Sequence, residues 1–301
     1  MSAPESSGFT GGPSVAISNS VASAAKCSRA LALACLSASD VARKLELTAS
    51  AGASIAAELM RTAPASAPQA AAEVAGRPER PLLVPARELR QRKLSSPEGR
   101  AALIHAVAHI EFNAINLAWD AVYRFDHLPD AYYRDWASVA VDEARHFAML
   151  EQRLRELGHE YGDFPAHDGL WSTAVATAHD LVARMALVPR VLEARGLDVT
   201  PPMIQRLLAA DDHATAAILE VILREEVRHV AIGSQWFRFA CAAARLEPRA
   251  TFMRLLSDYG FDRIRGPFNH AARLRAGFDE LEMLELERLD SREQSFDKNH
   301  T

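Results

Sequence analysis

Two five-residue words, DEARH at 142–146 and EEVRH at 225–229, decide how this chain is expected to fold. Both follow the pattern acid, Glu, any residue, Arg, His, and both lie where apolar residues recur with helical spacing. Residues three apart on an α-helix share a face, so the second acid and the histidine of each word point the same way. Each word therefore offers one carboxylate and one imidazole on one side of a helix.

Two further acids stand at matched distances before these words. Glu111, in HIEFNAINLAWD, precedes Glu143 by 32 residues, and Glu193, in LVPRVLEARG, precedes Glu226 by 33. This near-equal spacing predicts two antiparallel helical hairpins, each with a lone glutamate on its first helix and Glu-x-x-His on its second. Both lone acids interrupt apolar stretches, where a buried carboxylate needs a cation or strong donors beside it.

Four carboxylates and two imidazoles in one helical bundle would balance two divalent ions. The expected ligands are Glu111, Glu143, His146, Glu193, Glu226 and His229. An oxygen-rich set with imidazole favours iron or manganese, because a structural zinc site favours cysteine and a single tetrahedral ion. We expect two iron ions, with manganese as the alternative.

The residues beside these ligands are expected to support them. A metal-bound imidazole usually donates its second N–H to a carboxylate, which fixes its tautomer. Asp142 and Glu225 are each expected to accept this hydrogen bond from the histidine of the other helix. Arg145 and Arg228, one in each word, are expected to pair with these acids and to lower the cost of burying them.

Helical periodicity predicts six helices, at 97–125, 130–157, 172–195, 203–244, 249–260 and 270–289. Ser96 and Pro97 are typical of a helix start, and Gly158 and Gly196 stand where helices are expected to end. Pro189 should leave one carbonyl of the third helix without its partner and bend that helix near the site. No alternating strand pattern is present, so the predicted class is all-α.

The rest of the chain is expected to flank a four-helix bundle at 95–248. The other predicted segments are a disordered N-terminus at 1–20, a helical segment at 21–60, a Pro-rich linker with a basic stretch at 61–94, C-terminal helices at 249–290 and a disordered tail at 291–301. Prolines remove the backbone donors that a helix interior needs, which predicts an extended linker.

The composition excludes several classes of protein. The 301 residues are 49% hydrophobic and 24% charged, which is enough for a sizeable core, and no apolar run is long enough to span a membrane. A formal charge of −5 disfavours a surface coated by nucleic acid. RELRQRK, at 87–93, is interpreted as exposed linker, with an RNA or acidic-partner site as the alternative. Three sparse cysteines predict free thiols in the cytoplasm.

The ligand pattern resembles the ferritin-like di-iron carboxylate superfamily. The fuller words are similar to repeats of its oxygen-activating branch, the acyl carrier protein desaturases and bacterial multicomponent monooxygenases. EGRAALIHAVAHIE, AHDGLWSTAVATAHDLVARMALVPRVLEARGLDVTPPM and GPFN resemble a bacterial ferritin-like family, domain of unknown function 455, over about 78–280. The resemblance implies the fold and the metal site but no reaction. Glu225 departs from Asp142 of the first word, so its contact is less firmly expected.

Three functions are compared. The first is an oxygen-activating di-iron oxidoreductase, a hydroxylase or desaturase, with a substrate cavity expected near Ala114, Phe147 and Met185. Its partners would be dioxygen, a small-molecule substrate and a separate electron donor, because no Rossmann-type glycine motif or cysteine cluster is present. The alternatives are a non-catalytic metal-binding module and iron storage or detoxification. No membrane partner is expected, and a homodimer is allowed for.

His109 lies about 200° around its helix from Glu111 and should stay outside the site.

Overall fold

The computed structural model of the protein describes residues 28–56, 75–90, 92–261 and 264–297, with the side chains of 291–297 left out. Helices make up most of these ranges, and no β-strand is found within them. An isolated parallel bridge joins Leu83 to Ala166, with Val84 N donating to Ala166 O at 2.8 Å. The predicted all-helical class is confirmed.

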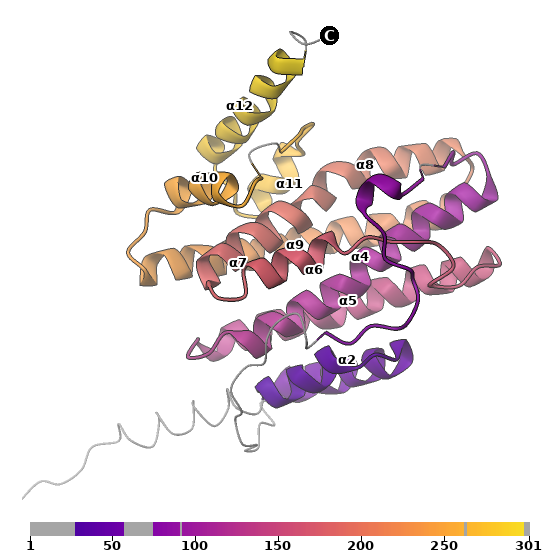
Figure 1. The fold of residues 1–301 in the computed structure, drawn as a ribbon, viewed down its shortest axis with the longest axis horizontal. Helices are drawn as coiled ribbons and strands as arrows, with labels where there is room; N and C mark the ends of the chain where they lie inside the picture. Colours follow the sequence, from indigo (N-terminus) through magenta and orange to yellow (C-terminus); the bar gives the residue numbers. More distant parts are fainter. Residues whose placement is uncertain (1–27, 57–74, 91, 262–263, 298–301) are drawn as a thin grey trace, which may run out of the picture.

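Two pairs of helices form the centre of the molecule (Figure 1). The main elements are α4 (Pro97–Arg124), α5 (Asp130–Glu156), α7 (Leu181–Leu187), α8 (Ala194–Ala209) and α9 (His213–Ala243). Helices α4 and α5 form the first pair. In the second pair, α7 and α8 together pack along α9. Contacts between α5 and α9 join the two pairs, so the helices that carry the two words face each other.

Helix α4 starts as the sequence predicted and forms the most buried element. Ser96 Oγ accepts a hydrogen bond from Gly99 N at 3.0 Å, and Pro97 takes the first helical position. Of the described helices, α4 alone is long and apolar enough to cross a membrane, but 78% of that apolar window is buried inside the protein. A core helix has the same composition, because all its faces meet other helices.

The third predicted helix is interrupted rather than continuous. Instead of one helix at 172–195, the chain forms α6 (Gly169–Ala176), a turn, α7 and a π-helical segment at Val188–Glu193. Asp180 explains the turn, because its Oδ1 accepts from Val182 N at 2.7 Å and caps α7. The predicted disturbance at Pro189 is therefore real, but it takes the form of a widened π-turn.

Gly196 does not end a helix, and this prediction was wrong. Helix α8 continues through Gly196 and through Pro201 and Pro202. A proline at 201 leaves Leu197 O without its helical donor, and Asn269 Nδ2 donates to that carbonyl at 3.1 Å instead. The helix predicted at 203–244 is accordingly two helices.

The turn between α8 and α9 lies at 210–212. Asp212 caps α9, and its Oδ1 accepts from Thr215 N at 3.1 Å. At the end of α5, Gly158 follows the helix with φ 77°, as predicted for a helix C-terminus.

A helix over Ser28–Ser37 precedes α2 (Val41–Ala56), and α2 packs on α5. Lys44 of α2 is fully buried and donates to Asn116 Oδ1 of α4 at 2.7 Å. It also donates to the carbonyls of Cys35 and Leu36, each at 2.9 Å. Burial lowers the pKa of Lys44 to about 7, against the weaker opposing effect of Cys35.

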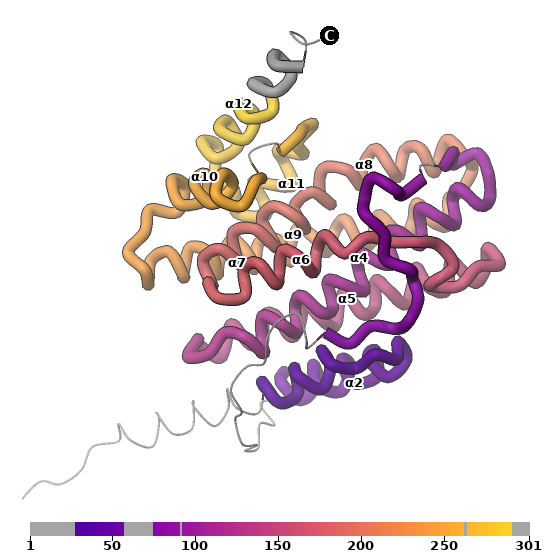
Figure 2. The backbone as a smooth tube through the Cα atoms, viewed as in Figure 1, coloured from indigo at the N-terminus to yellow at the C-terminus, as the bar shows by residue number. Residues whose placement is uncertain are grey.

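The C-terminal helices lie on the other side of the bundle from α2 (Figure 2). They are α10 (Pro248–Asp258), α11 (His270–Arg275) and α12 (Glu280–Asp297). The helix predicted at 270–289 is thus split by a turn at 276–279, and residues 291–297 of the expected tail belong to α12. Residues 1–20, also expected to be disordered, lie outside the described ranges.

Arg190, in the π-helical segment, anchors these C-terminal helices. Its guanidinium carbon lies 4.8, 4.3 and 4.5 Å from the ring centroids of Phe237, Phe252 and Phe278. Its Nη2 donates to Glu282 Oε1 at 2.7 Å, so the buried charge is paired. The π-turn is therefore held from outside by α10 and α12 as well as by α9.

Candidate metal centre

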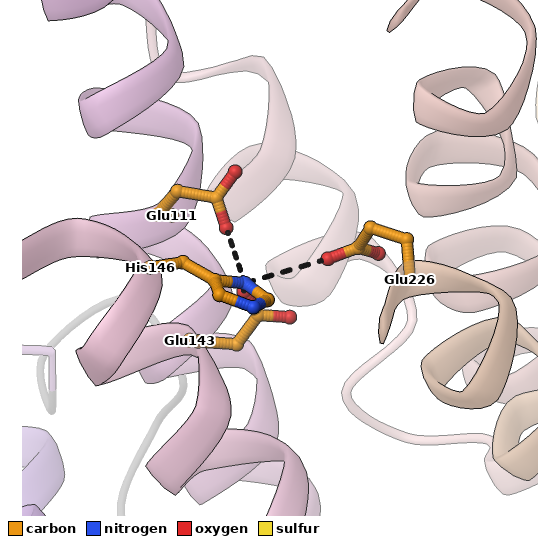
Figure 3. Close-up of side chains that lie close together, drawn as sticks. All are labelled: Glu111, Glu143, His146 and Glu226. Atoms are coloured by element: carbon orange, nitrogen blue, oxygen red, sulfur yellow. Dashed lines mark hydrogen bonds and ion pairs between the residues drawn. The ribbon is translucent and has the colours of Figure 1, made fainter. Parts of the chain in front are cut away.

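The interior between the two helix pairs holds a cluster of acids and imidazoles. Glu111 of α4, Glu143 and His146 of α5, and Glu226 of α9 each offer a ligand atom, and these four atoms lie within 4.8 Å of one another. Figure 3 shows these side chains converging, with Glu143 and His146 from α5 and the other two from α4 and α9. All four are buried, and the most exposed, Glu226, has 9% of its surface accessible.

His146 presents its Nδ1 atom to three carboxylates. The distances from Nδ1 are 3.3 Å to Glu143 Oε2, 3.5 Å to Glu111 Oε2 and 3.9 Å to Glu226 Oε1. These three acids come from three different helices. One nitrogen therefore faces a set of oxygens wide enough to surround a cation.

His229 faces the same interior from the other word. Its Nδ1 atom lies 2.9 Å from Glu143 Oε1 and 3.2 Å from Glu226 Oε1, and its ring centroid is 5.8 Å from that of His146. The two oxygens of Glu143 thus face different imidazoles. Such a carboxylate has the placement that bridging two cations requires.

Glu193, which lies in the π-helical segment, completes the set of six predicted residues. It lines the same cavity as the other three glutamates, and its Oε2 atom is buried without a hydrogen-bond partner. Burial first, and then the charges of Glu226 and Glu143, raise its pKa well above the usual range. The structure therefore gathers all six residues that the sequence singled out, although their role as ligands stays a prediction.

Asp142 and Glu225 lie behind the imidazoles, at the partly exposed edge of the bundle. His229 Nε2 donates to Asp142 Oδ2 at 3.2 Å, and His146 Nε2 donates to Glu225 Oε2 at 2.8 Å. Each acid therefore contacts the histidine of the other word, and the shorter Asp142 makes the longer contact. With Nε2 donating outward, Nδ1 of each neutral ring is an acceptor that faces the cluster.

Two arginines cover these acids. Arg145 pairs with Glu225 and, at 3.1 Å, with Asp142, while Arg228 pairs with Asp142 and donates to Ser138 Oγ at 3.0 Å. The arginine side chains are nearly half exposed, so they link the solvent to the groups behind the imidazoles.

Without a cation, the cluster has to hold protons. Burial, followed by the charge of Glu143, raises the pKa values of Glu111 and Glu226. Burial would lower the pKa of His146, but the carboxylates of Glu111 and Glu143 outweigh it and raise this pKa to about 11. Burial would raise the pKa of Glu143, yet His229 and its other neighbours bring it well below the usual range.

The residues present fit a pair of divalent cations. Four ionised carboxylates would carry four negative charges, which two divalent ions balance, and the orphaned Glu193 oxygen would gain a partner. Oxygen donors with imidazole suit iron or manganese. Cys35 and Cys241 are free and buried outside this cluster, and Cys27 lies outside the described residues.

A cavity of about 140 Å³ adjoins the four glutamates. Its other walls are Val107, Ile110, Ala114, Leu170, Leu192, Arg195, Gly196, Val199, Thr200, Met203, Leu219 and Ile222. Ala114 was expected here. Phe147 and Met185 do not line the cavity: Phe147 packs on the rings of Phe112 and Tyr161, and Met185 is buried.

His109 lies outside the cluster, as its helical rotation predicted. Its Nδ1 is 2.8 Å from the Tyr161 hydroxyl, and its Nε2 is 3.0 Å from Asn113 Nδ2. The sequence did not predict that Arg195 and Gly196 line the cavity, because both were placed at the end of a helix that in fact continues.

The fold and the cluster define an all-helical protein with a buried glutamate–histidine site that could hold metal ions. The chain belongs to the family described as "Protein of unknown function (DUF455)", whose pattern matches residues 37–284. An uncharacterized protein of Haemophilus influenzae is 45% identical over 217 residues, which are 70% of this chain and 75% of that relative. No solved structure matched the chain.

Proposed function

We propose that this protein is a ferritin-like di-iron carboxylate protein that uses dioxygen to hydroxylate or desaturate an organic substrate. The observation that carries this proposal is the juxtaposition of four carboxylates and two imidazoles with a mainly apolar cavity. Ferritin-like di-iron bundles draw one glutamate from each of two helices and Glu-x-x-His from each of the other two. Manganese is the alternative metal.

Each ligand would have a distinct position. Glu143 and Glu226, which approach both imidazoles, would both help to hold the ions. Glu111 would serve the ion beside His146, and Glu193 the ion beside His229. Bound iron would supply the activation of dioxygen, while the apolar cavity would keep bulk water from the reacting atoms.

The proposed reaction needs two partners besides the substrate. Hydroxylation places one oxygen atom of dioxygen in a C–H bond and reduces the other to water with two electrons and two protons. Desaturation removes two hydrogen atoms and reduces both oxygens to water with the same external electrons. A separate electron donor would deliver them, since no flavin- or nicotinamide-binding glycine motif is present in the sequence.

Metal analysis tests the centre directly. Protein purified without added metal should contain about two iron ions per chain, and Mössbauer spectroscopy of the oxidised protein should show antiferromagnetic coupling. Glu143→Ala and Glu226→Ala should abolish this occupancy. His109→Ala should retain it, because His109 contacts Tyr161 and Asn113 instead of the cluster. Full iron content in the two glutamate variants would refute the site.

Oxygen uptake separates the enzyme from its alternatives. The anaerobically reduced, iron-loaded protein should consume dioxygen rapidly, and the Glu143→Ala protein should not. A large shell of subunits that accumulates many irons per chain would indicate storage. Bound metal with no oxygen uptake, together with unfolding on chelation, would indicate a structural site.

A further inference from the structure

The cavity beside the cluster opens toward a second hollow near the surface. The outer hollow has a volume of about 440 Å³ and shares Ile110, Leu170, Leu192 and Arg195 with the inner cavity. Ile110 is 44% exposed, which places the opening at the surface. These shared residues form the mouth between solvent and the four glutamates.

Arginines line this mouth. Three of the described residues that line the outer hollow are arginines, namely Arg195, Arg265 and Arg273, and none is acidic. The nearby carboxylate of Asp198 accepts from Arg273 at 2.7 and 3.0 Å, so its charge is already compensated. Arg195 lies 3.8 Å from the same carboxylate.

Arg195 keeps donors for a ligand. Its Nη1 donates to Arg265 O at 2.7 Å, which uses one of five N–H groups, and the side chain is 43% exposed. A guanidinium stays charged at any physiological pH and recognises carboxylates and phosphates through paired hydrogen bonds. The mouth is therefore suited to an anion, and the inner walls to a hydrocarbon.

We propose that the substrate of the proposed di-iron site is a small organic anion with an unbranched apolar chain. Its anionic group binds at Arg195, and its chain enters the inner cavity so that carbons remote from the anion face Glu111, Glu193 and Glu226. This inference rests on the proposed function and adds the class and orientation of the substrate.

The reverse orientation is unfavourable. It would take the anionic group away from Arg195 into mainly apolar walls and would leave the apolar chain at the arginine-lined mouth. The inner cavity of about 140 Å³, close in size to a cavity that holds one benzene ring, also limits the chain to about six carbons before it is filled. Bulky ring systems do not fit this space.

Gly196 provides a way to close the cavity without disturbing its walls. It lines the inner cavity, and a Cβ built at this position meets no atom within 4 Å. Gly196→Leu therefore places a side chain in open space on a helix that tolerates leucine well. Gln205→Leu, at an exposed position of the same helix, is the matched control.

The test is calorimetric titration of the iron-loaded protein with straight-chain alkanoates from butanoate to dodecanoate. Affinity should rise about fourfold for each added methylene until the cavity is filled, and then level off. Gly196→Leu should weaken octanoate binding at least tenfold, and Gln205→Leu should leave it unchanged. Circular dichroism checks that both variants keep their helices.

The anionic contact is tested with two further variants and two further ligand series. Arg195→Gln should weaken alkanoates about tenfold or more but leave alkanols of equal length unaffected, and Arg195→Lys should recover part of the loss. Alkyl phosphates in the same titrations show whether the preferred anion is a carboxylate or a phosphate. Equal binding of alkanols and alkanoates, or an Arg195→Gln protein that binds as the parent does, overturns the proposal.

Repeating the titrations on chelated protein separates this inference from the proposed function. Iron binding and oxygen uptake without any chain-length dependence would refute the substrate class and leave the di-iron proposal standing. Alkanoate binding that follows the predicted pattern in a protein that never acquires iron would refute the di-iron proposal instead.

Discussion

Asp142 and Glu225 occupy equivalent positions in the two words, and each contacts the imidazole carried by the other helix. An anion at this position raises the basicity of the ring nitrogen on the opposite side and holds the ring in one orientation. The two acids are therefore expected to tune the centre without touching the metal.

Asp142→Asn and Glu225→Gln test this role, since each replaces a single carboxylate with an amide. Each amide preserves the shape of the acid but removes its charge, so the affinity for iron should fall about 10- to 100-fold. Competition with a chelating dye measures this change. Glu151→Gln is the control, because Glu151 lies on α5 and pairs with Arg155 rather than with a histidine. Unchanged affinity in both variants would mean that these acids only join the helices.

At the scale of single residues, the grouping of the six residues could be predicted because helical spacing and two near-equal intervals along the sequence encode it. The cross-pairing of Asp142 with His229 could also be anticipated from the repeated word. Arg195 could not, because it lies on a helix, α8, that continues through Gly196 and two prolines, and the carbonyl that Pro201 leaves open is served by Asn269, 72 residues away.

The element that departs most from a regular helix is the π-turn at Val188–Glu193, which carries one of the six residues. Sequence reasoning located the disturbance at Pro189 but not its form. Whether a helix kinks or widens depends on what packs against it, and here Gly233 of α9 approaches closely. A Cβ at Gly233 would lie 2.2 Å from Pro189 Cβ.

Gly233→Ala and Gly196→Ala should therefore change stability in opposite directions. The added methyl at 233 collides with Pro189 and should lower the free energy of unfolding by about 1–3 kcal/mol, with a loss of iron as Glu193 shifts. The methyl at 196 meets open space, and replacing a helical glycine should stabilise by up to about 1 kcal/mol. Urea unfolding measures both, and two changes of the same sign would contradict the packing described here.

On the scale of the whole molecule, the helix pairs are enclosed by an N-terminal layer on α5 and by the C-terminal helices around Arg190 (Figure 1). The all-helical class followed from the absence of strand patterns. The contact between α2 and α4 through Lys44 was not foreseeable, because a lysine in a helix is normally exposed. Lys44 is buried here because Asn116 and two backbone carbonyls accept its hydrogen bonds.

Lys44→Met should show the contribution of this contact as a change in the free energy of unfolding that depends on pH. Lys44 loses its proton near pH 7 in the folded protein and near pH 10.5 when unfolded. Between these values the unfolded chain binds more protons, so the lysine's contribution to the free energy of unfolding rises with pH. The stability difference between parent and variant should therefore grow in favour of the parent by about 2 kcal/mol from pH 7 to pH 9. Urea titrations at both pH values measure it, and a constant difference would contradict a depressed pKa.

Because each word supplies the acid that contacts the histidine of the other word, the site depends on both hairpins. A hairpin by itself presents an imidazole whose outward nitrogen lacks its acid, because that acid belongs to the other hairpin. In the proposed di-iron protein, iron loading would therefore follow docking of the two hairpins. A chain whose hairpins have not docked would then bind iron only weakly, so few ferrous ions would meet oxygen while exposed to solvent.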